Sequence, residues 1–372
     1  MMQKKILSLL ACSIFLLFEE MLTAQEINFN KKYNNVAFLT THNAYNYGLD
    51  ETFNFPNQTY PVSQQLEDGV RGFMLDIYLL DSVPHLYHGA SLLGTEPLSL
   101  VLSDIHDFLM ANPTEILTII FESYVSADVI ATALQDANLN DFLHEQSTEN
   151  PWPSLQNMID NDQRLVIFSE SENDSETDYP WYLYVWDYAV DTDYSNHQVT
   201  DLTCEFNRGS PENELFILNN FITHPTFGFG LIDSAMVINE FDFLYNYCEK
   251  CIVEKGKLPN FITVDFYDVG SGLAVTQAIN ALNVGINLPA KEEEQMLVFP
   301  NPFDKNICFN TNHQATVFPL SLQVFDIKGK ILREQKIEQF PFCMTEINWT
   351  AGIYFYEITG KEQILQGKII AK

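Results

Sequence analysis

Four apolar segments of the sequence end in side chains that can do acid–base or metal chemistry. These side chains are His42, Asp76, Glu122 and Asp265. Successive side chains of a strand alternate between two faces, and each of the four shares its face with apolar or small residues that precede it. Because barrel enzymes place their chemistry at the carboxyl ends of the strands, we expect the four to meet at one mouth. An imidazole can transfer protons there, and carboxylates can hold a hard cation.

The segments that position these residues alternate between strand and helix patterns. The expected strands are 36–42, 70–78, 116–123, 164–170, 216–222 and 261–267. The expected helices are 98–111, 127–136, 155–160, 234–254 and 272–282, and 171–180 reads as an acidic loop. Near-continuous apolar strands that alternate with helices indicate a parallel sheet buried on both faces. Residues 26–288 are therefore predicted to form an α/β protein, a TIM-like (β/α) barrel. In its last strand, parity puts Phe261, Thr263, Asp265 and Tyr267 on the inner face.

A second domain follows a polar hinge. Residues 289–295 contain three consecutive glutamates and form the expected linker. Beyond it, short strands are expected at 296–299, 320–325, 331–336, 353–358 and 366–370. This pattern predicts a small all-β sandwich over residues 296–372.

The first 24 residues have the features of a signal peptide. Lys4 and Lys5 precede the apolar run 6–18, and a cleavage site is expected before Gln25. A lipoprotein cleaved before Cys12 is the alternative. No later segment reaches the ~18 apolar residues of a membrane span. The mature protein is expected to be exported.

The charge of the chain is concentrated in the expected barrel. The formal net charge is −31, and residues 25–290 carry −30 of it. Such an acidic region repels phosphate backbones, so nucleic acid is not an expected partner. It also repels an anionic membrane unless a cation intervenes.

Five cysteines remain after removal of the expected signal peptide. In an exported protein a disulfide is the expected fate of cysteines such as Cys248 and Cys251, whereas a zinc half-site would lack a second ligand pair at suitable spacing. Connectivity remains open, although Cys308 and Cys343 are candidates to pair within the second domain.

Four motifs in order resemble the catalytic X domain of phosphatidylinositol-specific phospholipase C. They are THNAY at 41–45, GVRGFMLD at 69–76, LYHG at 86–89 and IIFE at 119–122. In that family the inositol 2-hydroxyl attacks the neighbouring phosphodiester, which releases diacylglycerol and leaves an inositol cyclic phosphate. The resemblance implies two catalytic histidines. His88 would protonate the leaving oxygen, and His42 would serve as the base or bind the phosphoryl oxygen. The implied substrate is phosphatidylinositol or a glycosylated form of it at a membrane surface.

The resemblance also implies a calcium ion. Asn43, Asp76 and Glu122 stand where the calcium-dependent branch has its ligands. The sequence departs from that branch at Met74, where a glutamate is usual, so Glu122 or His42 would act as the base. Asp265 is expected to hold a substrate hydroxyl or to orient His42. Parity places Arg71 on the outer face, where a structural role is expected.

The C-terminal domain resembles the sorting domain of type IX secretion. The carrying segments are VFPNPF at 298–303, LQVFDIKGK at 322–330 and AGIYFY at 351–356. The resemblance implies passage through an outer membrane by the type IX machinery, and a secreted or cell-surface protein.

Two other functions remain open. A glycerophosphodiester phosphodiesterase would share the barrel and the use of histidine and metal, but it would begin its site with His-Arg-Gly, whereas Asn43 follows His42. A catalytically inactive barrel that serves as a surface binding module is the second alternative, and Met74 is its best support.

Overall fold

The computed structural model describes residues 28–50, 52–225, 229–282, 296–299, 301, 303–311, 318–326, 330–345, 347–360 and 364–372. The expected signal peptide and the linker at 289–295 lie outside these residues. The chain divides into two units, Met1–Ile286 and Asn287–Lys372.

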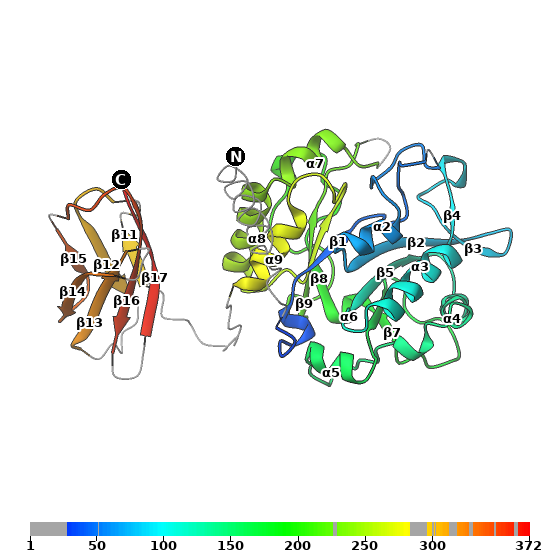
Figure 1. Ribbon diagram of the computed structural model, residues 1–372, viewed down its shortest axis with the longest axis horizontal. Helices are drawn as coiled ribbons and strands as arrows, with labels where there is room; N and C mark the ends of the chain where they lie inside the picture. The colour runs from blue at the N-terminus through cyan, green and yellow to red at the C-terminus, as the bar shows by residue number, and fades with distance from the viewer. Residues whose placement is uncertain are drawn as a thin grey trace, which may run out of the picture. The chain divides into compact units, whose positions relative to one another are not determined.

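Eight parallel strands curl into the barrel of the first unit, and helices cover their outer side (Figure 1). The sheet runs in the order β7-β6-β5-β2-β1-β10-β9-β8. The strands are β1 Phe38–Thr41, β2 Gly72–Leu80, β5 Leu117–Ser123, β6 Leu165–Ser169, β7 Tyr182–Tyr184, β8 Ala189–Asp191, β9 Leu215–Asn220 and β10 Phe261–Val264. An antiparallel extension, β3 Val83–Leu86 with β4 Glu96–Pro97, continues from β2. The predicted barrel is confirmed.

The helices of this unit lie between the strands in sequence. They are α2 Val62–Glu67, α3 Leu98–Ala111, α4 Ala127–Asp136, α5 Leu155–Asp160, α6 Val185–Tyr188, α7 Ile232–Ile238, α8 Phe241–Lys255 and α9 Gly272–Ala281, with 3-10 turns η1 Tyr33–Asn35, η2 Ser91–Leu93, η3 Asn140–Phe142 and η4 Val199–Asp201. The single helix expected at 234–254 is in fact two, α7 and α8. Among the helices described, none is both long and apolar enough to cross a membrane.

Strand parity sorts the buried residues into two clusters. The inner cluster fills the barrel and includes Phe38, Ile120, Val166, Phe168 and Phe261. The outer cluster lies between the strands and the helices and includes Leu39, Phe73, Ile119, Ile167 and Ile262. The inner space is tight where β1 meets β2, because a Cβ at Gly72 would lie 2.3 Å from Thr40 Oγ1.

Two sequence expectations about inner and outer faces have different outcomes. Arg71 lies on the outer side, where its Nε donates to Glu115 at 2.6 Å and its guanidinium covers the ring of Phe108, so the structural role is confirmed. Tyr267, expected inside, belongs to the outer cluster, and its hydroxyl donates to Asp68 at 2.6 Å. The alternation ends because β10 stops at Val264 and Phe266 takes a left-handed φ of 48°.

The second unit consists of two antiparallel sheets, as predicted. One sheet has the order β11-β12-β15 and the other β14-β13-β16-β17. The strands are β11 Met296–Phe299, β12 Ile307–Thr311, β13 Leu320–Phe325, β14 Ile331–Ile337, β15 Phe342–Met344, β16 Gly352–Thr359 and β17 Ile364–Ala371. Their inward side chains, among them Phe309, Leu322, Val324 and Tyr356, form a separate apolar core.

Disulfides occur in both units. Cys308 and Cys343 face each other on β12 and β15 and are bonded, as expected. In the first unit Cys251 pairs with Cys204 rather than with its neighbour Cys248, which is a buried free thiol.

Candidate active site

The four residues expected at the barrel mouth come from neighbouring strands. The sheet order β5-β2-β1-β10 sets side by side the strand ends that carry them. Asp76 and Glu122 are directly paired across β2 and β5. The His42 amide donates to the Val264 carbonyl at 3.1 Å, which holds the start of the loop after β1 against the end of β10.

His42 and Asp265 form the first carboxylate–histidine pair. His42 Nδ1 lies 2.9 Å from Asp265 Oδ1, and the Asp265 side chain is only 2% exposed. The imidazole stacks on the Phe221 ring with centroids 4.0 Å apart and planes 4° apart. The ring is thus fixed by the bond to Asp265, a longer contact of 3.5 Å between Nδ1 and Asn57 Nδ2, and the stacking contact, and Nε2 is the nitrogen that remains for a substrate.

Asn57 supports this pair from a loop that carries no sequence motif. Its Nδ2 donates to both Asp265 oxygens, at 3.1 and 3.2 Å. Its Oδ1 accepts from Asn46 Nδ2 at 2.8 Å and from Asn43 Nδ2 at 3.3 Å. A Cβ at Gly230 would lie 2.5 Å from Asp265 Oδ2, so a second loop also approaches this carboxylate closely. Both oxygens of Asp265 are therefore bonded to protein groups.

His88 and Asp76 form the second pair. His88 Nδ1 lies 2.9 Å from Asp76 Oδ2; the Asp76 side chain is 4% exposed and the His88 side chain 43%. The hydrogen bond to Asp76 raises the pKa of His88 because the carboxylate stabilises the imidazolium. His88 lies in the loop between β3 and β4, outside the barrel strands.

Glu122 lies next to Asp76 and is held by a tyrosine. The Tyr124 hydroxyl donates to Glu122 Oε1. Burial, and then the charge of Asp76, raise the pKa of Glu122. Three tyrosines stack beside it, with Tyr78 between Tyr87 and Tyr124 at 4.2 Å from each.

The donor set at this point suits a hard divalent cation. Asp76 and Glu122 are adjacent carboxylates with no lysine or arginine bonded to either in the described residues, and each has one oxygen outside the hydrogen bonds given above. Asn43 is buried at the turn after β1. Its amide nitrogen donates to Asn57 Oδ1, and this orientation leaves the amide oxygen of Asn43 as a possible ligand for a cation. Two carboxylates and an amide are oxygen ligands of the kind that calcium prefers. Met74 adds no oxygen, since it packs against the inner apolar cluster. Among the described residues, no group of three or more His, Cys, Asp or Glu side chains is placed to hold a metal ion by itself.

An arginine occupies the other side of the strand ends. Arg208 bonds Glu170, the residue after β6, at 2.8 Å and Asp191, the last residue of β8, at 2.7 Å. Its guanidinium lies 4.3 Å from the Trp186 ring centroid and 4.2 Å from that of Tyr194. Burial raises the pKa of Glu170 to about 7. Glu170 ends an expected strand and could have been singled out, but no motif marked Arg208.

An apolar cavity of about 230 Å³ adjoins His88. Its aromatic and aliphatic wall is formed by Phe53, Phe55, Leu93 and Phe229. Phe55 and Leu93 are 45% and 43% exposed, so the wall extends to the surface. The acid–base residues therefore lie beside an apolar surface.

Comparison with protein families identifies both units. Residues 29–280 match the family model of the PI-PLC X domain. The chain belongs to the PI-PLC X family. Residues 297–372 match the secretion-system C-terminal sorting domain, which implies export by the type IX machinery. Both resemblances seen in the sequence are confirmed.

Relatives within the PI-PLC X family are distant. A PI-PLC X domain-containing protein of Arabidopsis thaliana is 27% identical over 273 residues, which cover 68% of this chain and 62% of the relative. Two proteins of Arthroderma benhamiae also match. One, described as an uncharacterized secreted protein, is 23% identical over 58% of this chain and 53% of its own length. The other, PI-PLC X domain-containing protein 1, is 22% identical over 68% of this chain and 87% of its own length.

Solved structures give similar coverage. The phosphatidylinositol-specific phospholipase C of Listeria monocytogenes is 18% identical, with a TM-score of 0.49 over 69% of this chain and 96% of that one. A mutant of the Staphylococcus aureus phosphatidylinositol-specific phospholipase C is 12% identical, with a TM-score of 0.47 over 69% and 94%.

Proposed function

We propose that this protein is a secreted phosphodiesterase that cleaves phosphatidylinositol-type lipids to diacylglycerol and an inositol cyclic phosphate. The observation that carries the proposal is the pair of histidines at the mouth, each bonded through Nδ1 to a buried carboxylate. Acid–base cleavage of a phosphodiester needs one group to accept a proton and a second to supply one. The two pairs supply one histidine for each of these two tasks.

His42 is the proposed base. Asp265 accepts a hydrogen bond from His42 Nδ1, which places the proton there and leaves a lone pair on Nε2. That lone pair takes the proton of the inositol 2-hydroxyl as the hydroxyl oxygen bonds to phosphorus. Glu122 is less suited to this step, because its carboxylate already accepts the Tyr124 hydroxyl.

His88 is the proposed acid. Its raised pKa favours the imidazolium, which can give its Nε2 proton to the glycerol oxygen as the bond from phosphorus to that oxygen breaks. The apolar cavity beside His88 is on the side where the diacylglycerol would depart. The proton gained by His42 and the proton lost by His88 balance, so the two histidines exchange protonation states in one turnover.

Calcium is proposed as the cofactor. Asn43, Asp76 and Glu122 would hold it, and when bound it would supply positive charge to the phosphoryl oxygens. Apart from His42 and His88 this part of the mouth is acidic, so it repels a phosphodiester without such a cation. The type IX machinery and a phosphatidylinositol or glycosylated phosphatidylinositol lipid at a membrane surface are the proposed partners.

The test is release of water-soluble phosphate from phosphatidylinositol micelles with and without chelator, with a glycerophosphodiester assayed in parallel. The proposal predicts cleavage of phosphatidylinositol that stops in chelator and returns with added calcium. Cleavage of the glycerophosphodiester alone would favour the other phosphodiesterase, and no cleavage of either would favour an inactive binding barrel. Unchanged activity in chelator would show that calcium is not the cofactor.

A leaving-group experiment tests the two histidines separately. Removing a general acid typically costs ~10²–10⁴-fold in rate, so His88→Ala should lose that much on phosphatidylinositol. The loss should shrink on a nitrophenyl inositol phosphate, whose leaving group needs little protonation. His42→Ala should be impaired on both substrates. His85→Ala is a matched control, because among the described residues this partly exposed histidine on β3 bonds the Val83 carbonyl and no residue of the two pairs. Equal recovery of both variants would show that the roles are wrongly assigned.

A further inference from the structure

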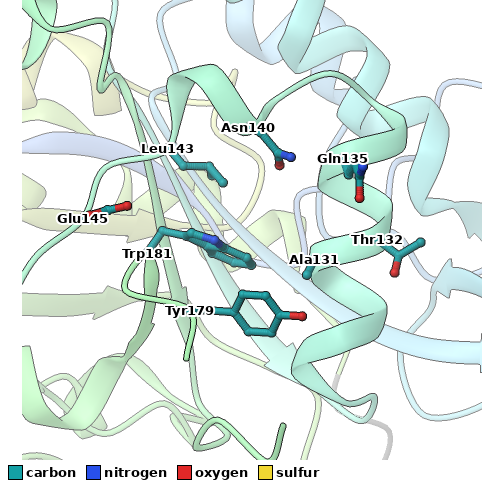
Figure 2. Close-up of a pocket in the computed structure, with 8 residues that line it drawn as sticks. All are labelled: Ala131, Thr132, Gln135, Asn140, Leu143, Glu145, Tyr179 and Trp181. Carbon is teal, nitrogen blue, oxygen red and sulfur yellow. The ribbon is translucent and has the colours of Figure 1, made fainter. Parts of the chain in front are cut away.

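A second cavity, of about 370 Å³, opens on the flank of the barrel beside α4 (Figure 2). It exists because the connection from β6 to β7, residues 170–181, contains no helix. Crossovers between parallel strands usually contribute a helix that covers the sheet. Here Tyr179 and Trp181 pack against the outer apolar cluster instead and leave a hollow next to them.

The cavity has an aromatic side and a polar rim. The rings of Tyr179 and Trp181 lie 5.2 Å apart with their planes at 42°, and in Figure 2 both project toward α4. The Tyr179 hydroxyl donates to Asp128 at 2.7 Å, which fixes that ring. Gln135, Asn140 and Glu145 line the rim. Among the described residues their side chains have no protein hydrogen-bond partner, so their amide and carboxylate groups are available to a ligand.

The lining chemistry selects the class of ligand. It contains no lysine, arginine or histidine, so it is unsuited to a phosphate or carboxylate. It offers two primary amides and a carboxylate, which are too polar for an acyl chain. A sugar ring has an apolar C–H face that can stack on an indole or phenol, and hydroxyls that both donate to and accept from amides. We propose that this flank cavity binds a neutral saccharide.

The cavity is separate from the barrel mouth. Leu143, in its wall, bridges to Leu165, the first residue of β6, whereas His42 and Asp265 directly follow the last residues of β1 and β10. A saccharide bound here would leave the mouth open to substrate. The cavity would thus hold the enzyme on a glycosylated surface, and the proposal stands whether or not the lipid assignment is correct.

Tryptophan fluorescence of the full chain tests the proposal. Trp181 is one of four tryptophans, so ligand stacking on it should give a saturable change in emission. The probes are cellobiose, maltose and chitobiose at up to millimolar concentrations, with choline chloride as a separate arm. At least one disaccharide should bind, and Trp181→Phe should abolish the signal. The double variant Gln135→Ala, Asn140→Ala should weaken binding about tenfold, since it removes two hydrogen-bonding groups.

Controls keep this test independent of folding and of the active site. Gln156→Ala changes an exposed glutamine on α5 that does not line the cavity, and it should bind as the parent does. All variants should retain phosphodiesterase turnover and thermal unfolding temperature. The proposal is overturned if no disaccharide binds by calorimetry, or if the double variant binds as tightly as the parent. Binding of choline alone, by cation–π contact with the two rings, would also overturn it and would assign the cavity to a cation.

Discussion

Replacement of Asp265 by asparagine distinguishes a positioning carboxylate from a substrate ligand. Asn57 Nδ2 donates to both oxygens of Asp265 in the parent protein. An asparagine has one oxygen, and if that oxygen accepts from Asn57 its amide nitrogen must face His42 Nδ1. His42 would then accept at Nδ1 and carry its proton on Nε2, where it cannot act as a base.

The expected loss follows from the bond that is removed. A hydrogen bond to a charged group contributes about 1.5–3 kcal/mol, which corresponds to a factor of about 10–100 in rate. The unfavourable tautomer adds to this, so we expect kcat to fall by at least about 10²-fold. KM should change little, because Asp265 is 2% exposed and its oxygens are bonded to His42 and Asn57.

The assay is steady-state cleavage of phosphatidylinositol in mixed micelles, with thermal unfolding of each variant measured alongside. Asp160→Asn makes the same chemical change on the exposed surface of α5 and should leave both parameters unchanged. A large rise in KM with kcat retained would refute the reasoning and would make Asp265 a residue that holds a substrate hydroxyl.

Three further predictions concern stability and domain independence. Burial raises the pKa of Glu96 from 4.5 to about 7. The contribution of the neutral Glu96 carboxyl to folding stability is therefore full below pH 4.5 and is lost as pH rises through 7. Glu96→Gln should raise the free energy of unfolding by about 1–2 kcal/mol at pH 8 in urea unfolding, with no gain at pH 4.5. Gly72→Ala should cost about 1–3 kcal/mol because its Cβ would overlap Thr40 Oγ1, and adding Thr40→Ala should recover much of this loss in thermal unfolding. A chain ending at Ile286 should unfold cooperatively and keep its kcat, and loss of activity in such a folded truncation would contradict independent units.

Regular elements were predictable where a local pattern determined them. The bounds of α3, α4 and α5 agree with the helical periodicity of the sequence. The break between α7 and α8 was missed because long-range bonds fix it: Asn239 donates to the backbone carbonyls of Asp265 and Phe266. The strands β7 and β8 have three residues each, too few for a periodic signal.

The site residues on or next to strands were predictable from the sequence, whereas those on loops were not predictable from spacing. Parity on the strands indicated that His42, Asp76, Glu122 and Asp265 share the mouth. His42 and Asp265 directly follow β1 and β10, and Asp76 pairs with Glu122 near the end of the parallel register between β2 and β5. His88 lies on a loop, and only the family resemblance singled it out. Asn57 carries no pattern of its own, since a side chain on a loop is brought to a site by tertiary contacts that spacing does not encode.

The central claim is that the two histidine–carboxylate pairs cleave the phosphodiester of phosphatidylinositol. It is tested most directly by following the products by phosphorus NMR in the presence of calcium, with the parent protein, His88→Ala and the control His85→Ala. An inositol cyclic phosphate should accumulate first with the parent and the control, and His88→Ala should slow its appearance by ~10²–10⁴-fold. Formation of glycerophosphoinositol or of a linear phosphate with no cyclic precursor, or full activity of His88→Ala, would contradict it.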